Sequence, residues 1–311
     1  MRHLPRLRRS WRLPVAVASS LLTVVLAGGC GNPAGVDGDL TDSWAAIGVP
    51  TGFTPVAETC HLANFTTAGT RATYEEVDCK LKHRTETVHV GTYPSPAAEA
   101  SDPPAPDSAG ARAAYRTCDA KTTAYVGGPW RTARLWIGVI QPTRAAWTGG
   151  ARWYRCEVLV SSSVEDDGGL VQRVGSLRDA LKERASPLLL TCYRVLLDKA
   201  GKIGTMPSTP CSAGHNAEFV GVWEAGDDGY PATTKQWDKL HDGCRGLIAG
   251  YVGVPDDADL QFRAGVISLP GGKDVWTLGD RGVRCYLWLD AATLTASLKG
   301  KGSKAMPVQY Q

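Results

Sequence analysis

Two long stretches of this chain repeat one succession of apolar and polar segments. Each stretch contains strand-like segments rich in β-branched and aromatic residues, together with one segment of helical periodicity that ends in glycine. The strand-like segments are 86–93, 134–142, 152–162, 217–223, 260–270 and 281–290, and the helical segments are 111–127 and 233–253. Because the strands surround one helix without regular alternation, we predict an α+β fold with two similar disulfide-containing domains, each a small, mostly antiparallel sheet with one main helix.

The ends of the two stretches share a ten-residue phrase. WTGGARWYRC (147–156) and WTLGDRGVRC (276–285) both read W-T-x-G-x-R-x-x-R-C and begin 129 residues apart. Eight cysteines keep the same phase, with offsets of 132, 132, 126 and 129 residues: Cys60, Cys79, Cys118 and Cys156 match Cys192, Cys211, Cys244 and Cys285. A repeat of this length predicts two globular domains from a duplicated four-cysteine unit, not a solenoid.

The start of the chain has the features of an export signal. Residues 1–13 carry five arginines and no acid, and residues 14–29 form an apolar segment too short for a lone transmembrane helix. This segment ends at Cys30 in a context similar to a bacterial lipobox, so we expect Cys30 to be lipidated. We therefore predict a signal peptide over 1–29, exported by either the general or the twin-arginine route.

The remaining domain limits follow from this signal and from the repeat. We expect a lipidated tether over 30–58, a first domain over 59–183, a second over 188–300 and a tail over 301–311. The chain has 34 Lys and Arg against 31 Asp and Glu, and losing the five arginines of the signal leaves 29 − 31 = −2. The mature protein therefore gives no electrostatic reason to expect nucleic acid as a partner.

An even number of cysteines in an exported protein predicts disulfides. The segment between the first two cysteines of each unit has a glycine-bearing turn near its midpoint, which predicts a hairpin with the two cysteines opposed. Four cysteines allow three pairings, so the other connectivities stay open. The favoured pairs, two from the hairpins and two left over, are Cys60–Cys79, Cys192–Cys211, Cys118–Cys156 and Cys244–Cys285.

The order of these motifs resembles the septum-formation domain of exported or membrane-attached proteins in high-GC Gram-positive bacteria. The shared pattern is C…C-x-x-x-H…V-x-V-G…C…YVG-x-P…W-x-x-G-x-R-x-x-x-C…S-L, and the two units show it over residues 59–300. That family often has proline before the histidine, where this chain has Lys82 and Gly214. The resemblance implies tandem copies of such a domain and a role at the division septum, with a poorly defined biochemical activity.

Two repeated histidines are the most reactive candidates. His83 and His215 each follow a cysteine as C-x-x-x-H, and the set Cys211, His215, His241 and Cys244 spells an order compatible with zinc. The first unit lacks the second histidine, and export favours bonded sulfurs over thiolates. We therefore expect no metal, and we interpret both histidines as structural residues that bond a carbonyl or carboxylate, with a binding role as the alternative.

The arginines of the repeated phrase are three residues apart, which predicts opposite faces of a strand. We expect one of each pair to bond carbonyls at the turn and the other to stay in solvent. In the alternative interpretation, Arg152 and Arg281 bind an anion or carboxylate, because guanidinium forks fit such groups. Trp147 and Trp276 are expected to cover the core near a disulfide.

Hydrolase, metalloprotease and phosphate-loop signatures are absent from the sequence, and no carboxylate pair stands out. We therefore expect no catalytic residues and no cofactor. We interpret the protein as a non-enzymatic lipoprotein on the outer face of the cell membrane that binds an envelope protein or a cell-wall component. The alternatives are an enzyme of unrecognised type with His83 or His215 as acid/base, and an ectodomain with a small-molecule ligand.

Overall fold

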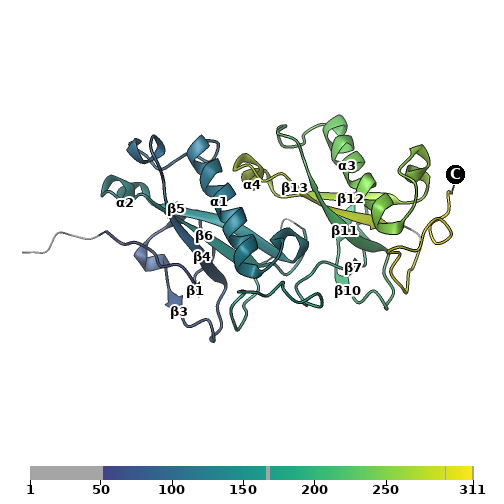
Figure 1. The fold of residues 1–311 in the computed structure, drawn as a ribbon, viewed down its shortest axis with the longest axis horizontal. Helices are drawn as coiled ribbons and strands as arrows, with labels where there is room; N and C mark the ends of the chain where they lie inside the picture. Colours follow the sequence, from purple (N-terminus) through teal and green to yellow (C-terminus); the bar gives the residue numbers. More distant parts are fainter. Residues whose placement is uncertain (1–51, 166–168, 291, 310–311) are drawn as a thin grey trace, which may run out of the picture. The chain divides into compact units, whose positions relative to one another are not determined.

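The structure is a computed structural model that describes residues 52–165, 169–290 and 292–309. Residues Gly52–Gln311 belong to one compact unit. The expected signal peptide, Cys30 and most of the expected tether lie outside the described residues. We call the described residues before 188 the first half and those from 188 onward the second half (Figure 1).

The first half contains a six-stranded sheet in the order β2-β5-β6-β4-β1-β3. Neighbouring strands are antiparallel, except that β2 and β5 are parallel. Strand β6 lies between two neighbouring strands and is buried along its whole length, Arg155 and Glu157 included. The strands are β1 (Thr59–His61), β2 (Ala68–Gly69), β3 (Glu76–Val77), β4 (Thr85–Thr92), β5 (Leu135–Pro142) and β6 (Trp153–Val160).

The second half contains a five-stranded antiparallel sheet in the order β10-β7-β11-β13-β12 and a separate two-stranded sheet, β8-β9. Corresponding strands occupy corresponding places, because β5-β6-β4-β1-β3 of the first sheet matches β12-β13-β11-β7-β10. The predicted α+β class, with two similar sheets, is confirmed. The strands are β7 (Cys192–Tyr193), β8 (Leu196–Leu197), β9 (Ile203–Thr205), β10 (Ser208–Thr209), β11 (Ala217–Glu224), β12 (Gly265–Pro270) and β13 (Gly282–Trp288).

One long helix packs against each sheet, as Figure 1 shows: α1 (Ala109–Val126) and α3 (Thr234–Val252). Ser108 and Thr233 cap the helix starts, because each side chain accepts a hydrogen bond from a first-turn N–H. Gly127 and Gly253 end the helices with φ of 81° and 85°, in the left-handed conformation that glycine adopts without strain. The glycine-terminated helices predicted from the sequence are therefore present.

Short helices occupy the connections. They are α2 (Arg144–Thr148) and α4 (Lys273–Thr277), which precede the last strand of each half, and the 3-10 helices η1 (Arg71–Thr73), η2 (Ala97–Glu99), η3 (Trp130–Thr132) and η4 (Ala258–Phe262). Helices α2 and α4 carry the tryptophans of the repeated phrase. Trp147 and Trp276 are buried in the clusters that contain the helix disulfide of each half, as predicted.

Strands β5 and β12 both contain the letters G-V-I, but these letters are out of register by two residues. Gly138 pairs with Glu157 whereas Gly265 pairs with Trp288. Counted from the shared cysteine of the last strand, Ile267 takes the place of Gly138. Because strands of similar composition repeat G-V-I by chance, the register is decided by which residues face the core.

The segments between the first two cysteines are not simple hairpins. In the first half β1 pairs with β3, while the intervening β2 pairs with β5 at the opposite edge of the sheet. In the second half β7 pairs with β10, and the intervening residues form the separate β8-β9 hairpin around Gly201. Cys60 therefore opposes Val77 and not Cys79, although the two cysteine Cα atoms are only 5.2 Å apart.

All four disulfides join the cysteines that the sequence favours. One disulfide of each half lies at the sheet edge, and the other ties the long helix to the last strand, where the sulfur-bearing residues are completely buried. The bonds are Cys60–Cys79, Cys118–Cys156, Cys192–Cys211 and Cys244–Cys285. None of the helices in the described residues is long and apolar enough to span a membrane.

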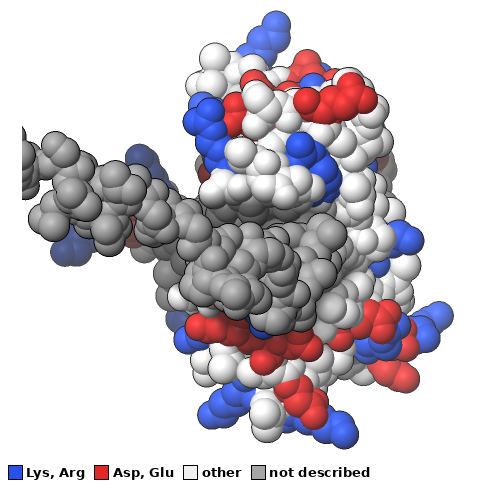
Figure 2. Space-filling view, turned by 90° about the vertical axis from the view of Figure 1, so that its left-hand side faces the viewer, with Lys and Arg blue, Asp and Glu red and all other residues white. Residues whose placement is uncertain are grey.

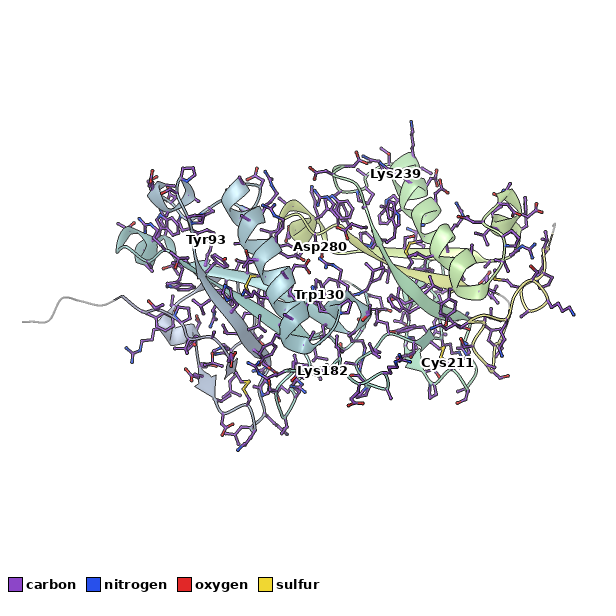
Figure 3. All side chains as sticks on the ribbon, viewed as in Figure 1. Tyr93, Trp130, Lys182, Cys211, Lys239 and Asp280 are labelled. Atoms are coloured by element: carbon purple, nitrogen blue, oxygen red, sulfur yellow. A yellow bond between two sulfur atoms is a disulfide. The ribbon has the colours of Figure 1, made fainter. Side chains whose placement is uncertain are left out.

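The halves meet where η3 contacts β11 and β13, at the position of Trp130 and Asp280 in Figure 3. The buried carboxylate of Asp280 accepts hydrogen bonds from Tyr115 Oη (2.9 Å) and from Arg131 Nε (3.0 Å) and Nη2 (2.7 Å). Arg284 donates in return to backbone carbonyls of the first half, 2.7 Å from Leu135 O. The junction is therefore a buried, paired set of charges.

Candidate functional site

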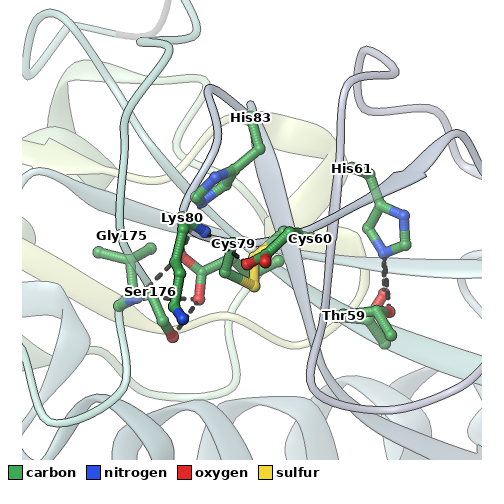
Figure 4. Close-up of a disulfide and its surroundings, with 12 residues drawn as sticks. Thr59, Cys60, His61, Cys79, Lys80, His83, Gly175 and Ser176 are labelled. Carbon is green, nitrogen blue, oxygen red and sulfur yellow. Dashed lines mark hydrogen bonds and ion pairs between the residues drawn. A yellow bond between two sulfur atoms is a disulfide. The ribbon is translucent and has the colours of Figure 1, made fainter.

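A buried glutamate at the start of β4 gathers the repeated polar residues of the first half. Figure 4 shows His83 and Ser176 beside the Cys60–Cys79 disulfide. His83 Nδ1 also lies 2.9 Å from the carbonyl oxygen of Leu81. The carboxylate of Glu86 has five hydrogen-bonding neighbours: His83 Nε2 (3.1 Å), Tyr125 Oη (3.2 Å), Arg173 Nη1 (2.9 Å), Ser176 Oγ (2.9 Å) and the Leu177 N–H (2.8 Å).

The second half builds the same arrangement around Glu218. His215 Nδ1 lies 2.9 Å from the carbonyl oxygen of Ala213. The position of Arg173 is taken by Leu294, since each pairs with the histidine of its own half. The neighbours of the Glu218 carboxylate are His215 Nε2 (3.3 Å), Tyr251 Oη (2.7 Å), Ser297 Oγ (2.7 Å) and the Leu298 N–H (2.8 Å).

We call each set of histidine, glutamate, tyrosine and serine the carboxylate latch. It ties the start of a long strand, the C-terminal end of the long helix and the serine-leucine segment that follows the last strand. His83 and His215 are both fully buried and bonded within their own half. The structural interpretation of these two predicted candidates therefore agrees with the geometry.

The electrostatics of the first latch favour the ionised carboxylate. Burial would raise the pKa of Glu86, but hydrogen bonds from His83, Leu177 and Ser176 and the charge of Arg173 offset this, and the pKa is lowered. Each latch also brings a cysteine, a histidine and a glutamate within 4.8 Å of one another, which resembles a metal ligand set. The sulfurs are those of Cys60 and Cys192, which are in disulfides, so neither triplet offers the thiolate that a metal needs.

The zinc order noted in the sequence is not assembled either. Cys211 and Cys244 are bonded to different cysteines, and His241 Nδ1 lies 3.0 Å from Ser268 Oγ on β12, away from the His215 latch. The order of these four residues in the sequence is compatible with a zinc site, but the fold does not bring their side chains together. The helix position of His241 and the loop position of His215 separate them.

Arg152 and Arg281 hold the turn of the repeated phrase. Arg152 Nη1 donates to the Trp147 carbonyl (2.6 Å), and Arg281 Nη1 donates to the Trp276 carbonyl (2.6 Å). Each guanidinium also stacks on that tryptophan, at 4.3 and 4.8 Å from the ring centre. The glycine two residues before each arginine has φ of 93° or 101°, so the turn needs glycine there.

The prediction that the second arginine of each pair stays in solvent is wrong. Arg155 and Arg284 are only 4% and 5% exposed. Arg284 is satisfied by carbonyls of the first half, whereas Arg155 Nε and Nη1 have no hydrogen-bond partner among the described residues. The cause is that β6 and β13 are central strands, covered on both faces.

A cavity of about 210 Å³ lies beside Arg152. It is lined by Gly52, Phe53, Thr54, Thr92 and residues 149–153. The matching surface of the second half is covered by the first half, because a Cβ on Gly282 would lie 2.3 Å from Arg131 Cδ. Arg152 therefore lines a cavity, while the counterpart of that surface beside Arg281 is closed.

Next to this cavity, the first half buries a second polar cluster on the sheet face opposite α1. His61 Nδ1 lies 2.6 Å from the carbonyl oxygen of Tyr74, and Nε2 lies 2.8 Å from Thr87 Oγ1. Thr87 donates to Glu157, so its hydroxyl connects the imidazole to the carboxyl group. Glu157 also lies 3.4 Å from Arg155 Nε. Figure 4 shows His61 and its contact with Thr59.

Burial shifts both titratable ends of this cluster toward their neutral forms. Burial, followed by the charge of Arg155, lowers the pKa of His61 to about 4. Burial raises the pKa of Glu157, and the charge of Arg155 opposes that change. A buried histidine, hydroxyl and carboxyl in series can hold a proton at either end, which is acid/base chemistry in principle.

The same positions in the second half are aromatic. Counted in the phase of the repeat, His61, Thr87 and Glu157 correspond to Tyr193, Phe219 and Tyr286. Tyr286 stacks edge-on with Tyr193 (5.4 Å between ring centres) and with Phe219 (5.5 Å). The polar cluster is therefore a property of the first half alone.

A comparison with known protein families matches the septum formation family over residues 57–285. The chain belongs to the septum formation family. The match runs as one span across both halves, so the family pattern includes both sheets. No curated protein and no solved structure matches the chain. Four disulfides in this septum formation protein are typical of a domain that folds outside the cytoplasm.

Sequence reasoning missed the centre of the latch in this septum formation protein. Glu86 and Glu218 stand three residues after the repeated histidines, in the same phase of 132, so H-x-x-E was visible. It also missed the polar cluster, because the residues of this cluster are not repeated in the second half. The signal there is a difference at equal phase, such as His61 against Tyr193.

Proposed function

We propose that this septum formation protein is a non-enzymatic envelope lipoprotein that binds a protein or cell-wall partner at the cell surface or division septum. Lipidated Cys30 would anchor it to the outer face of the cell membrane. The family membership and the disulfides support this compartment. The same order of five corresponding strands in the two sheets supports an origin by tandem duplication of one unit.

The cavity beside Arg152 carries the proposal of binding. The second half uses its copy of this surface for a contact between polypeptide segments, in which Arg131 reaches Asp280. The first half has Ala151 where the second has Asp280, and its copy of the surface is open. In the second half, this surface binds a segment of the same chain. The equivalent surface of the first half is therefore suited to bind a segment of a partner.

The chemistry of this cavity favours a partner group with a carboxylate. Arg152 supplies the guanidinium, and Phe53 and Trp153 supply aromatic walls whose ring centres lie 6.0 Å apart. The volume suits one side chain or peptide terminus and not a whole cofactor. Side chains of both signs occur on the face of the molecule that Figure 2 shows, so a single-sign polyanion such as nucleic acid is not favoured.

The matched pair Arg152→Ala and Arg281→Ala tests this role. Both variants lose carbonyl bonds and one stacking contact, so both should lose comparable stability. Only Arg152→Ala should weaken co-sedimentation with isolated cell-wall sacculi, by about tenfold, the usual worth of a hydrogen bond to a charged group. Equal binding by both variants would show that Arg152 serves the fold alone.

A second experiment tests the anchor and the location. Cys30→Ser should move the protein from the membrane fraction to the soluble extracytoplasmic fraction, because it removes the lipid attachment site. None of the helices in the described residues is long and apolar enough to hold the protein in the membrane instead. A fluorescent fusion in dividing cells should concentrate at the septum. A uniform envelope signal would contradict the septal part of the proposal and leave the anchor in place.

One observation favours the enzyme alternative, in a different place from the one predicted. The latch histidines are bonded on both nitrogens, which argues against His83 and His215 as acid/base. The buried series of His61, Thr87 and Glu157 has the composition of an acid/base pair. Release of soluble fragments from sacculi that is abolished by Glu157→Gln, in a variant that still folds, would favour an enzyme over a binding protein.

A further inference from the structure

The β8-β9 hairpin of the second half exposes several large aliphatic side chains close together in the sequence. Three of the eight large exposed aliphatic or aromatic side chains belong to it: Leu196, Leu197 and Ile203, at 43%, 41% and 38% exposure. The remaining five are distributed over other segments. Every residue of the hairpin from Leu196 to Thr205 is exposed. Because an isolated two-stranded hairpin is marginally stable in water, this exposure requires an explanation.

The corresponding segment of the first half is folded down onto its sheet. There Phe65 lies over Gly138, where a Cβ would approach the ring to 2.1 Å. In the second half, Ile267 takes the place of Gly138, and Val164 and Leu190 share the apolar cluster on that face. The space that would receive the segment is therefore filled, and β8-β9 stands away from the sheet.

The hairpin is also cationic. Arg194, Lys199 and Lys202 are exposed and form no ion pair among the described residues. The one acid within the hairpin, Asp198, is engaged in the turn, since its carboxylate accepts the N–H of Ala200 (2.8 Å) and of Lys202 (2.9 Å), and Glu165 beside the end of β9 accepts the N–H of Met206. Because Asp198 is bonded within the turn, it does not pair with the three cations, which lie exposed near the aliphatic side chains.

We infer that the β8-β9 hairpin inserts into the headgroup region of an anionic phospholipid bilayer. Neighbouring residues of a strand point to opposite faces, so Leu196 and Leu197 expose aliphatic surface on both sides of the hairpin. A protein partner docking on one face would leave the other face in water. The interface of a bilayer surrounds both faces and places phosphate groups next to Lys199 and Lys202. The inference is independent of the cavity beside Arg152.

Co-sedimentation with vesicles tests this contact. The protein is the chain from residue 30 onward with Cys30→Ser, which carries no acyl chain and retains the compact unit that begins at Gly52. We expect binding to vesicles that contain phosphatidylglycerol and much weaker binding to phosphatidylcholine alone. Lys199→Gln with Lys202→Gln should weaken binding to the anionic vesicles roughly ten- to thirtyfold, since each lysine near such a surface contributes about 1 kcal/mol.

Variants of the aliphatic side chains complete the test. Leu197→Ser with Ile203→Ser should also weaken binding, at unchanged net charge. The control is Leu81→Ser with Val174→Ser, two first-half residues of higher exposure (60% and 59%), which should bind as the parent does. No binding of the parent to anionic vesicles, or an equal loss in the control, would overturn the inference. Loss only with the lysine variant would also overturn it, because surface attraction without insertion would then suffice.

Discussion

The two halves agree on the helix side of the sheet and differ on the opposite side. On the helix side, each has a disulfide from the long helix to the last strand and a carboxylate latch at the end of that helix. On the opposite side, the first half buries His61, Thr87 and Glu157, whereas the second half has three aromatic rings in the same positions, of which Tyr193 and Tyr286 are buried and Phe219 is partly buried. The helix-side contacts are therefore sufficient to specify the fold.

The polar cluster of the first half is not needed for that fold. Burying charged and polar groups costs free energy, and replacing a buried ion pair by well-packed apolar residues is often neutral or stabilising. The second half shows that this backbone accepts the replacement. Arg155 adds to the cost, because its Nε and Nη1 have no hydrogen-bond partner among the described residues, although Nε lies 3.4 Å from the carboxylate of Glu157. A group retained against its cost is a reasonable place to expect function.

The largest effect is expected from breaking the latch. Glu86→Ala and Glu218→Ala each leave a buried imidazole, a phenol, a hydroxyl and a backbone N–H without their acceptor. We expect each to lower the free energy of unfolding by about 3–5 kcal/mol, with the larger loss for Glu86, which also pairs with Arg173. Urea unfolding followed by circular dichroism measures both values.

The exposed Glu76→Ala is the control for the latch and should change stability by less than about 0.5 kcal/mol. A loss below about 1 kcal/mol in Glu218→Ala would mean that the latch stabilises only the first half. The latch would then not be a contact that both halves need for their fold.

The next effect concerns the asymmetry of the junction. Asp280→Ala removes the acceptor of Tyr115 and leaves Arg131 with one carboxylate partner, Asp119, in place of two. We expect a loss of about 2–4 kcal/mol in the same unfolding experiment. Asp227→Ala is the matched control, because this residue pairs with Arg281 but is 99% exposed at the side chain. An equal cost in both variants would mean that the junction contributes no more than a surface ion pair.

The sequence predicts the architecture of each half well, for physical reasons. Helices are predicted by periodicity and by their caps, such as Ser108 and Gly127. The two disulfides from the long helix to the last strand, Cys118–Cys156 and Cys244–Cys285, were expected only as the pairs left over once the first two cysteines of each unit were paired. The equivalence of residues in β5 and β12 does not follow from the shared letters G-V-I, because short apolar strands look alike and the pairing with the last strand, at Glu157 and Trp288, sets the register.

The candidate sites are predicted less well, because they depend on contacts between distant segments. Burial of Arg155 follows from coverage of β6 on both faces, which no local pattern announces. In the second half, the turn of the repeated phrase is covered by Arg131 of the first half. No described residue covers the equivalent turn of the first half in this way, so a cavity remains beside Arg152. A repeated motif identifies what the two halves share, and differences at equal phase identify what only one half does.

The smallest expected effect is a pH dependence of the free energy of unfolding that comes from His61, on the sheet face where the two halves differ. His61 has its pKa lowered from 6.5 to about 4, so the unfolded chain binds a proton in this range and the folded protein does not. Stability should therefore fall as the pH drops from about 6.5 toward 4, by up to about 2–3 kcal/mol. His61→Tyr, which copies Tyr193 of the second half, should remove this part of the pH dependence in urea unfolding.

Glu157 acts in the opposite direction, since its raised pKa means that the folded protein holds a proton longer than the unfolded chain, which favours folding on acidification. Because His61→Tyr leaves Glu157 in place, the difference between the two pH curves isolates the imidazole. His241→Gln is the control, with a histidine whose pKa is lowered by burial in the second half. The contradicting outcome is that His61→Tyr changes the pH dependence of unfolding no more than His241→Gln does. His61 would then titrate like an ordinary half-buried histidine. The two halves would differ in the shape of their side chains on this face but not in its electrostatics.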